Sequence, residues 1–230
     1  MKECLMCKAP LRNEIRLSEI IRATPLINDP ICQGCSNDFL DLADIPTCLG
    51  CGRKQTEGMS QPCRDCSRWQ QSYPFNFSNC ALYEYNQQMK DFMKQYKFNG
   101  DYYLRKVFSG QIHRQLKKCP DVIVPIPVGT DTMLTRGFNQ VTGLLELVNY
   151  SNILKVKAKR KAVRQSEKNR RQRIELIQPF ELIQSQKYLI ENQSILLVDD
   201  VYTTGTTIRH AASLLYHAGA TSVRGLTLAR

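Results

Sequence analysis

The sequence predicts an α/β protein with a mainly parallel sheet flanked by helices, preceded by a small cysteine-rich, zinc-binding module. Three observations predict this fold class. Four CxxC pairs fall within the first 66 residues, apolar strands alternate with amphipathic helices from residue 80 onward, and one strand runs directly into two aspartates and a threonine-rich turn. A chain of 230 residues has room for one ordinary domain and a small appendage. We therefore expect a cysteine-rich module at 1–70, a linker at 71–79 and the α/β domain at 80–230.

The cysteine-rich module has few large apolar residues for a hydrophobic core, so its fold needs another source of stability, such as a bound metal. A CxxC pair places two thiolates on one tight turn, and two such turns close a tetrahedron around zinc. Consecutive pairing predicts two structural zinc sites, although the spacing also permits an interleaved arrangement. The eight ligands are Cys4, Cys7, Cys32, Cys35, Cys48, Cys51, Cys63 and Cys66. The two single cysteines, Cys80 and Cys119, are expected to be buried apolar thiols.

The α/β domain is predicted from alternating periodicities, after a stretch at 68–79 that is typical of a linker. Strands are expected at 80–85, 122–124, 195–198 and 222–228. Helices are expected where apolar residues recur three and four apart. These helical sets are Met89, Phe92, Met93 and Tyr96; Leu104, Phe108, Ile112 and Leu116; Val141, Leu144, Leu145 and Val148; and Ile208, Ala211, Ala212 and Leu215.

The segment 195–207 is the most informative part of the domain. Four apolar residues bring Asp199 and Asp200 to the carboxyl end of a strand, which is where ligands bind in open α/β sheets. The turn Thr203-Thr204-Gly205-Thr206-Thr207 follows, and then a helix begins, so hydroxyl groups, backbone N–H groups and the helix dipole suit a phosphate monoester. The paired carboxylates suit the hydroxyls of a ribose or an Mg²⁺ ion. An Asp-Asp turn that only caps the helix is the alternative.

At these residues the sequence resembles a known family. Residues 198–207, VDDVYTTGTT, resemble the phosphoribosyl-diphosphate signature of type I phosphoribosyltransferases. The segments VPIP at 124–127 and RGFNQ at 136–140, together with the preceding cysteine pairs, resemble the ComF family over essentially the whole chain. The resemblance implies a type I phosphoribosyltransferase-like fold.

The resemblance also implies a binding site for Mg²⁺ and phosphoribosyl diphosphate. In it, Asp199 and Asp200 contact the ribose hydroxyls and hold Mg²⁺ through the ligand, and Thr203 to Thr207 surround the 5′-phosphate. The binding segment is Asp199, Asp200, Val201, Tyr202, Thr203, Thr204, Gly205, Thr206 and Thr207. Val128 and Gly129 would face the pyrophosphate, with Arg136 close by.

Two further residues stand out against the family pattern. Lys97 falls where the ComF family carries a basic residue, and the sequence gives it no role. Tyr202 departs from the wider transferase signature, which favours an aliphatic residue, and this difference weighs against ordinary nucleotide salvage.

A strongly basic segment runs from Lys155 to Arg173 and carries +9 of the formal net charge of +11. Three interpretations stay open: a solvated flexible stretch, a lid over the ligand, or a surface that binds the phosphates of nucleic acid. The residues proposed for nucleic acid are Lys159, Arg160, Lys161, Arg164, Arg170, Arg171 and Arg173. Because aromatic residues are absent from 151–179, base stacking would fall to Trp69, Tyr73, Phe75 and Phe77. His210 and His217 are expected at the surface.

Composition sets the broad limits on function. The excess of Lys and Arg, with a pI near 9.2, favours polyanionic partners. No apolar run approaches the ~20 residues of a membrane helix, and the start has no apolar stretch of signal-peptide length, so we expect a cytoplasmic protein.

Two functions from different classes remain. The resemblance implies a competence protein that handles incoming single-stranded DNA in natural transformation, with the ATP-driven helicase-like protein of the uptake system as partner. The alternative is an active phosphoribosyltransferase of nucleotide metabolism, in which a nucleophile displaces pyrophosphate. The sequence offers no segment that we can name as a base-recognition element, which favours the first function.

Overall fold

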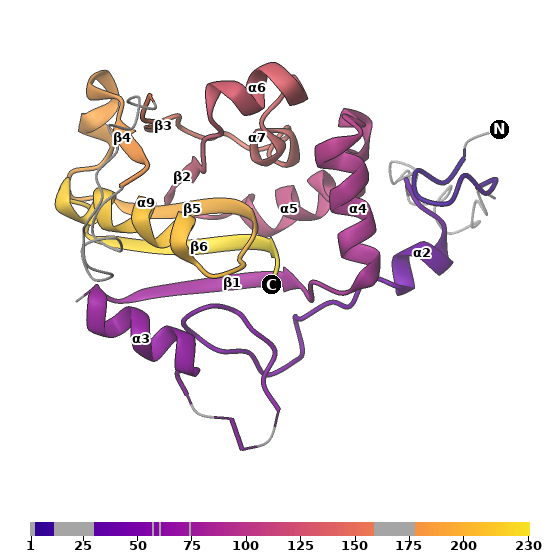
Figure 1. The fold of residues 1–230 in the computed structure, drawn as a ribbon, viewed down its shortest axis with the longest axis horizontal. Helices are drawn as coiled ribbons and strands as arrows, with labels where there is room; N and C mark the ends of the chain where they lie inside the picture. The colour runs from indigo at the N-terminus through magenta and orange to yellow at the C-terminus, as the bar shows by residue number, and fades with distance from the viewer. Residues whose placement is uncertain (1–2, 12–29, 57, 60, 74, 159–177) are drawn as a thin grey trace, which may run out of the picture.

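A computed structural model describes residues 3–11, 30–56, 58–59, 61–73, 75–158 and 178–230. Its centre is a four-stranded parallel sheet in the order β1-β6-β5-β2 (Figure 1). The strands are β1 (Phe77–Tyr83), β2 (Val122–Pro125), β5 (Ser194–Val201) and β6 (Ser222–Ala229). The parallel sheet and its four strands confirm the predicted fold class.

Helices cover both faces of this sheet. On one face α9 (Thr206–His217) packs over β5 and β6, and it stands in front of them in Figure 1. The other face is covered by α4 (Gln87–Phe98), the 3₁₀ helix η1 (Tyr102–Val107), α5 (Ser109–Leu116) and α7 (Gln140–Leu144). Strand β5 is buried on both sides, because Leu196 and Val198 face one core while Ile195 and Leu197 face the other.

The remaining elements frame the sheet. They are α2 (Gln33–Asn37), α3 (Arg64–Ser72), α6 (Thr130–Arg136), β3 (Leu154–Val156), β4 (Phe180–Leu182) and the 3₁₀ helix η2 (Gln184–Leu189). Strands β3 and β4 form a small antiparallel pair. Among the described residues, no helix is both long and apolar enough to cross a membrane.

Several element boundaries differ from those predicted. The helix expected over 104–116 is two elements, because the backbone at Phe108 leaves the helical region (φ −120°, ψ −16°), although all four of its apolar residues are buried. The helix expected as far as Val148 ends at Leu144. Residues 68–72 of the expected linker are helical in α3, and β1 begins at Phe77 instead of residue 80.

Two predictions about burial are wrong. Cys80 is exposed, because β1 is an edge strand and its outward positions face solvent, whereas Cys119 is half-buried. His210 is buried on α9, where its Nδ1 lies 3.2 Å from the Tyr73 hydroxyl, while His217 is exposed as expected.

Candidate ligand site and metal clusters

The eight paired cysteines gather into two separate groups of four. In each group the sulfur atoms lie within 4.8 Å of one another. The first group is Cys4, Cys7, Cys32 and Cys35; the second is Cys48, Cys51, Cys63 and Cys66. This grouping is the consecutive pairing, so the interleaved arrangement does not occur.

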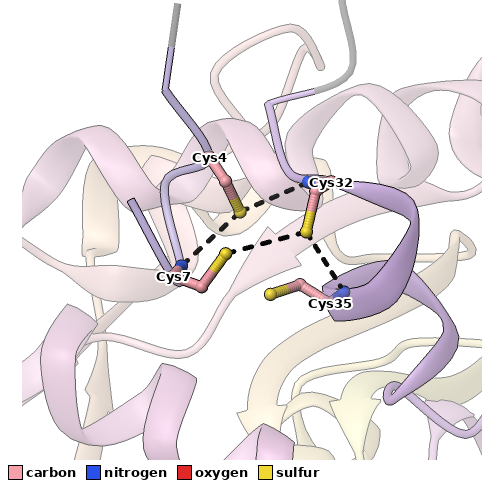
Figure 2. Close-up of side chains that lie close together, drawn as sticks. All are labelled: Cys4, Cys7, Cys32 and Cys35. Carbon is pink, nitrogen blue, oxygen red and sulfur yellow. Dashed lines mark hydrogen bonds between the residues drawn. The ribbon is translucent and has the colours of Figure 1, made fainter. Parts of the chain in front are cut away.

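The first cluster lies beyond α4, on the side of the molecule away from β2 in Figure 1. Figure 2 shows its four side chains converging on a common centre. Backbone N–H groups donate to its sulfurs: Cys32 N lies 3.2 Å from Cys4 Sγ, and Cys35 N lies 3.5 Å from Cys32 Sγ. Cys7 is exposed and Cys4 is buried, so the cluster is partly open to solvent.

The second cluster is buried, and all four of its cysteines belong to one of the two hydrophobic cores of the sheet. The Nδ2 of buried Asn79 on β1 donates to the carbonyl of Cys51 at 3.3 Å and to Thr227 Oγ1 on β6 at 2.9 Å. The second cluster is therefore built onto the sheet, and it shares a core with α9.

The sulfur geometry of both clusters fits zinc. A tetrahedron with Zn–S bonds of ~2.3 Å has S–S edges of about 3.8 Å. The observed separations are 3.7 Å for Cys7–Cys32, 3.7 Å for Cys51–Cys63 and 3.9 Å for Cys48–Cys66. These distances are far longer than the ~2.05 Å of a disulfide bond. Two four-cysteine clusters that could hold structural zinc are thus present.

At the carboxyl end of β5, Asp199 and Asp200 are both buried. Because successive strand residues point to opposite faces, the two carboxylates have different surroundings. Asp200 pairs with Lys97 from the last turn of α4, with 2.7 Å between Lys97 Nζ and Asp200 Oδ2. The structure therefore gives Lys97 a place that the sequence did not: it supplies the cation beside the second aspartate.

Asp199 is buried, with 8% of the residue exposed. Burial, and next the charge of Asp200, raise its pKa from the ordinary 3.8 to about 8, even though the Asp200 N–H donates to Asp199 Oδ1 at 2.9 Å. A buried acid of this kind is costly to ionise until a cation or hydrogen-bond donor arrives. The pair Asp199–Asp200 is thus chemically suited to a ligand that brings hydroxyl groups or a divalent cation.

The turn after β5 presents hydroxyl groups to solvent. Thr203, Thr204, Thr206 and Thr207 are exposed, and the Thr204 and Thr206 hydroxyls lie 2.9 Å apart. Helix α9 begins after Gly205, which has no side chain to cap it, and the Thr206 N–H donates to Thr204 Oγ1 at 3.4 Å. Backbone N–H groups at a helix start, next to several hydroxyls, suit a phosphate.

Gly205 is needed in this turn for two reasons. Its φ of +83° is in the left-handed region that favours glycine, and a Cβ on it would collide with the buried ring of Tyr202. The side chain of Tyr202 therefore sets the shape of the turn from beneath, while the threonines face outward.

The residues expected on the pyrophosphate side lie beside this strand end. The loop that follows β2 is fastened to β5 by the Ile126 N–H, which donates to the Val198 carbonyl at 2.9 Å, and half-buried Val128 and Gly129 lie in that loop. Arg136, at the end of α6, donates from Nε to the Lys97 carbonyl at 3.0 Å and from Nη1 to Gln140 Oε1. The structure thus brings Arg136 next to the Lys97–Asp200 pair.

Some predicted residues cannot be placed. Lys159, Arg160, Lys161, Arg164, Arg170, Arg171 and Arg173 lie outside the described residues. Of the described part of the basic segment, Lys155 on β3 pairs with Glu181 on β4 at 3.2 Å.

Sequence reasoning missed Arg209, which is buried and donates from Nε to the Tyr202 hydroxyl at 2.9 Å. A signal for it existed in the unusual Tyr202 and in an arginine next to the apolar Ile208 near the start of the predicted helix.

Comparison with known proteins agrees with this architecture. The family model of the phosphoribosyl transferase domain matches residues 106–230. The competence protein ComFC of Streptococcus pneumoniae (strain ATCC BAA-255 / R6) is 36% identical over 99% of this chain and 100% of its own length. ComFC of Bacillus subtilis (strain 168) is 28% identical over 99% of this chain and 94% of its own length. Competence protein F of Haemophilus influenzae (strain ATCC 51907 / DSM 11121 / KW20 / Rd) is 26% identical over 87% of this chain and 90% of its own length. The chain therefore belongs to the ComF family of competence proteins, and its carboxyl-terminal half is a phosphoribosyl transferase domain.

Proposed function

We propose that this protein binds Mg²⁺ and phosphoribosyl diphosphate at the end of β5, and that it handles single-stranded DNA in natural transformation. The observation that carries the ligand site is the buried Asp199–Asp200 pair, with Lys97 Nζ 2.7 Å from Asp200 Oδ2, next to the threonine-rich start of α9. A buried acidic pair beside a phosphate-binding turn fits a ligand with both vicinal hydroxyls and phosphates.

Each part of the site has a role in this proposal. Asp199 and Asp200 accept hydrogen bonds from the ribose hydroxyls and hold Mg²⁺ through the ligand, while the turn from Thr203 to Thr207 donates to the 5′-phosphate. The loop with Val128 and Gly129 faces the pyrophosphate, and Arg136 adds positive charge on that side. Mg²⁺, when bound, neutralises pyrophosphate oxygens. Lys97 compensates Asp200 before the ligand arrives, and its ammonium has further N–H donors for a phosphate oxygen.

For stacking of single-stranded DNA we propose a different aromatic surface from the one that we predicted. Of the four predicted residues Phe77 is buried, and Trp69, Tyr73 and Phe75 are half-buried. In contrast, Phe98, Tyr102 and Tyr103 are 78%, 42% and 54% exposed, directly after Lys97. Two basic side chains lie over these rings, with Arg105 at 4.0 Å from the Tyr102 ring centre and Lys106 Nζ at 4.3 Å from the Tyr103 ring centre.

Exposed aromatic rings interleaved with basic groups are the usual means of binding single strands, with ~1–3 kcal/mol per stacked base. We propose that bases stack on this aromatic stretch, residues 98–103, and that the basic segment at 155–173 binds backbone phosphates or covers the ligand. The helicase-like ATPase of the uptake system remains our proposed protein partner.

Fluorescence anisotropy of a labelled single strand tests the DNA part of this proposal. We expect binding that weakens steeply with salt, because phosphate contacts release counterions. Phe98→Ala is expected to weaken binding roughly tenfold, whereas the control Tyr188→Ala, at a ring that is 72% exposed on η2 and outside the aromatic stretch, leaves it unchanged. Absence of binding at low salt contradicts the proposal.

The same titrations with Mg²⁺ and phosphoribosyl diphosphate show whether strand and ligand share one face, since a shared face predicts competition. Release of pyrophosphate from phosphoribosyl diphosphate distinguishes the enzymatic alternative. Turnover that depends on Asp199 and Asp200, in the presence of an acceptor, would favour an active transferase.

A further inference from the structure

The face of the phosphate turn opposite to the threonines rests on the second cysteine cluster and on α3. Among the described residues, polar contacts made by Arg209, Trp69, Arg230 and the Tyr73–His210 pair cross this boundary. They connect segments more than 130 residues apart in the sequence, so they depend on the folded cluster.

The central contact is made by Arg209, which is only 3% exposed. Its Nε donates to the Tyr202 hydroxyl at 2.9 Å, and its Nη2 donates to the Gly50 carbonyl at 3.2 Å and to Cys66 Sγ at 3.6 Å. The guanidinium lies 5.0 Å from the ring centre of Phe77. One buried side chain thus links a cluster sulfur to the tyrosine that shapes the turn.

A buried guanidinium needs a nearby negative charge, because an uncompensated charge in the interior is costly. The hydrogen-bond partners that the structure gives Arg209 are a hydroxyl, a carbonyl and a sulfur, and among these described partners there is no carboxylate. Four cysteine thiolates around one Zn²⁺ carry a net double negative charge. The second cluster with zinc bound would therefore supply the counter-charge that these described partners of Arg209 do not provide.

Two further contacts hold the turn from the same side. The Nε1 of Trp69 on α3 donates to the Thr204 carbonyl at 2.9 Å. Arg230 donates from Nη1 to the carbonyls of Tyr202 (3.1 Å) and Thr203, while its Nη2 lies 3.9 Å from Asp65 Oδ2 on α3. The backbone carbonyls of 202–204 are thus held by two side chains that are themselves positioned by the cluster region.

We propose that zinc in the second cluster is the counter-ion of Arg209 and, through Arg209 and Tyr202, sets the phosphate turn in its ligand-binding shape. Tyr202 and Arg209 are then positioning residues: they lie beneath the turn and act on the ligand through it. This inference rests on the proposed ligand site, and it explains why a tyrosine stands at 202 where transferase signatures favour an aliphatic residue. The first cluster has no part in it.

The test compares the full-length wild type with Tyr202→Phe, Arg209→Met and Tyr216→Phe. The last is a matched control on the same helix, since the described partners of the Tyr216 hydroxyl are backbone groups, the Asn76 carbonyl at 2.8 Å and the Val223 N–H at 3.0 Å. Affinity for Mg²⁺–phosphoribosyl diphosphate is measured by calorimetry, and release of zinc to a colorimetric chelator is followed over time.

We expect Tyr202→Phe and Arg209→Met to weaken binding of Mg²⁺–phosphoribosyl diphosphate about tenfold, because each removes the hydrogen bond between Arg209 and Tyr202 beneath the turn. We expect Arg209→Met also to speed the release of one of the two zinc ions. Tyr216→Phe should change neither the ligand affinity nor the rate of zinc release. If both variants bind the ligand like the wild type, the coupling is overturned. If the wild type itself fails to bind, the proposed ligand site is wrong, and the zinc-release rate of Arg209→Met alone decides the inference: an unchanged rate overturns it.

Discussion

Asp199 and Asp200 are neighbours in the chain and both are buried, yet the protein compensates their negative charges to different extents. Asp200 faces the ammonium of Lys97 at 2.7 Å, so its charge is compensated within the protein. Among the described residues, the Asp200 N–H and the more distant Lys97 favour ionisation of Asp199, but burial together with the Asp200 charge raises its pKa to about 8. One carboxylate is thus held ready as an anion, and the other becomes an anion when a ligand cation or donor compensates it.

The acidic pair can be tested by replacing both residues. Asp199→Asn with Asp200→Asn keeps the side-chain shape and removes both charges, so we expect binding of Mg²⁺–phosphoribosyl diphosphate to be lost in calorimetry. Undiminished affinity in this double variant would show that the ligand binds elsewhere. A thermal melt of the same variant serves as the control for folding.

The raised pKa of Asp199 also predicts how stability changes with pH. Because the native state keeps a proton that the unfolded chain loses above its ordinary pKa of 3.8, this group's contribution to stability is fully present below pH ~4. It is lost progressively as pH rises through about 8. The melting temperature of the ligand-free protein should therefore fall more between pH 6 and pH 9 for the wild type than for Asp199→Asn. Parallel pH profiles for the two proteins would contradict this assignment.

At the scale of elements, the turn between β5 and α9 is the part on which the site depends most. Its backbone needs a left-handed residue at Gly205, and the ring of Tyr202 fills the space where a Cβ would lie. Position 205 therefore has little freedom to accept other residues.

Gly205→Ala tests this rigidity. We expect a loss of roughly 2–4 kcal/mol in the free energy of unfolding, because left-handed strain adds to the collision with Tyr202. Gly137→Ala is the matched control: Gly137 has a φ of +82° but open space around it, so the strain alone should cost only ~1 kcal/mol. Urea denaturation measures both, and equal losses would show that the contact with Tyr202 has no effect.

Prediction from sequence succeeded for elements whose own residues show a clear hydrophobic period. The period of Met89, Phe92, Met93 and Tyr96 placed α4 correctly, since all four face the core. Strands β3 and β4, three residues each, are too short to show a period, and the break at Phe108 depends on tertiary packing. The acidic pair and the turn were predicted as a group, and the structure does place them together at the end of β5.

The contacts that complete the site join distant segments. Lys97 reaches Asp200 across more than 100 residues, and Arg209 reaches Cys66 across 143. No local pattern encodes such pairs, so the role of Lys97 and the position of Arg209 could not be inferred without the fold.

For the whole molecule, the two cysteine clusters make unequal contributions. The second cluster shares a hydrophobic core with β5 and α9, whereas the first is partly exposed and lies next to α4. Loss of metal should therefore have global consequences in one case and mainly local ones in the other.

Single cysteine substitutions distinguish the two clusters. Cys51→Ser is expected to lose one zinc ion and to destabilise the entire domain by about 4 kcal/mol or more, because a buried metal site in the core is broken. Cys7→Ser, at an exposed ligand, should also lose one zinc ion but lower the main thermal transition far less. Metal analysis and calorimetric melts of both variants measure this difference, and equal destabilisation would contradict it.

The position of Trp69 has a practical consequence. It is the single tryptophan of the chain, and its indole N–H is bonded to the Thr204 carbonyl, on the underside of the phosphate turn. The tryptophan emission of the unlabelled protein therefore comes from one residue, which lies where the cysteine-rich region and the ligand turn meet. Any movement of that turn, whether brought about by ligand, metal loss or mutation, can be followed in ordinary solution with a fluorimeter.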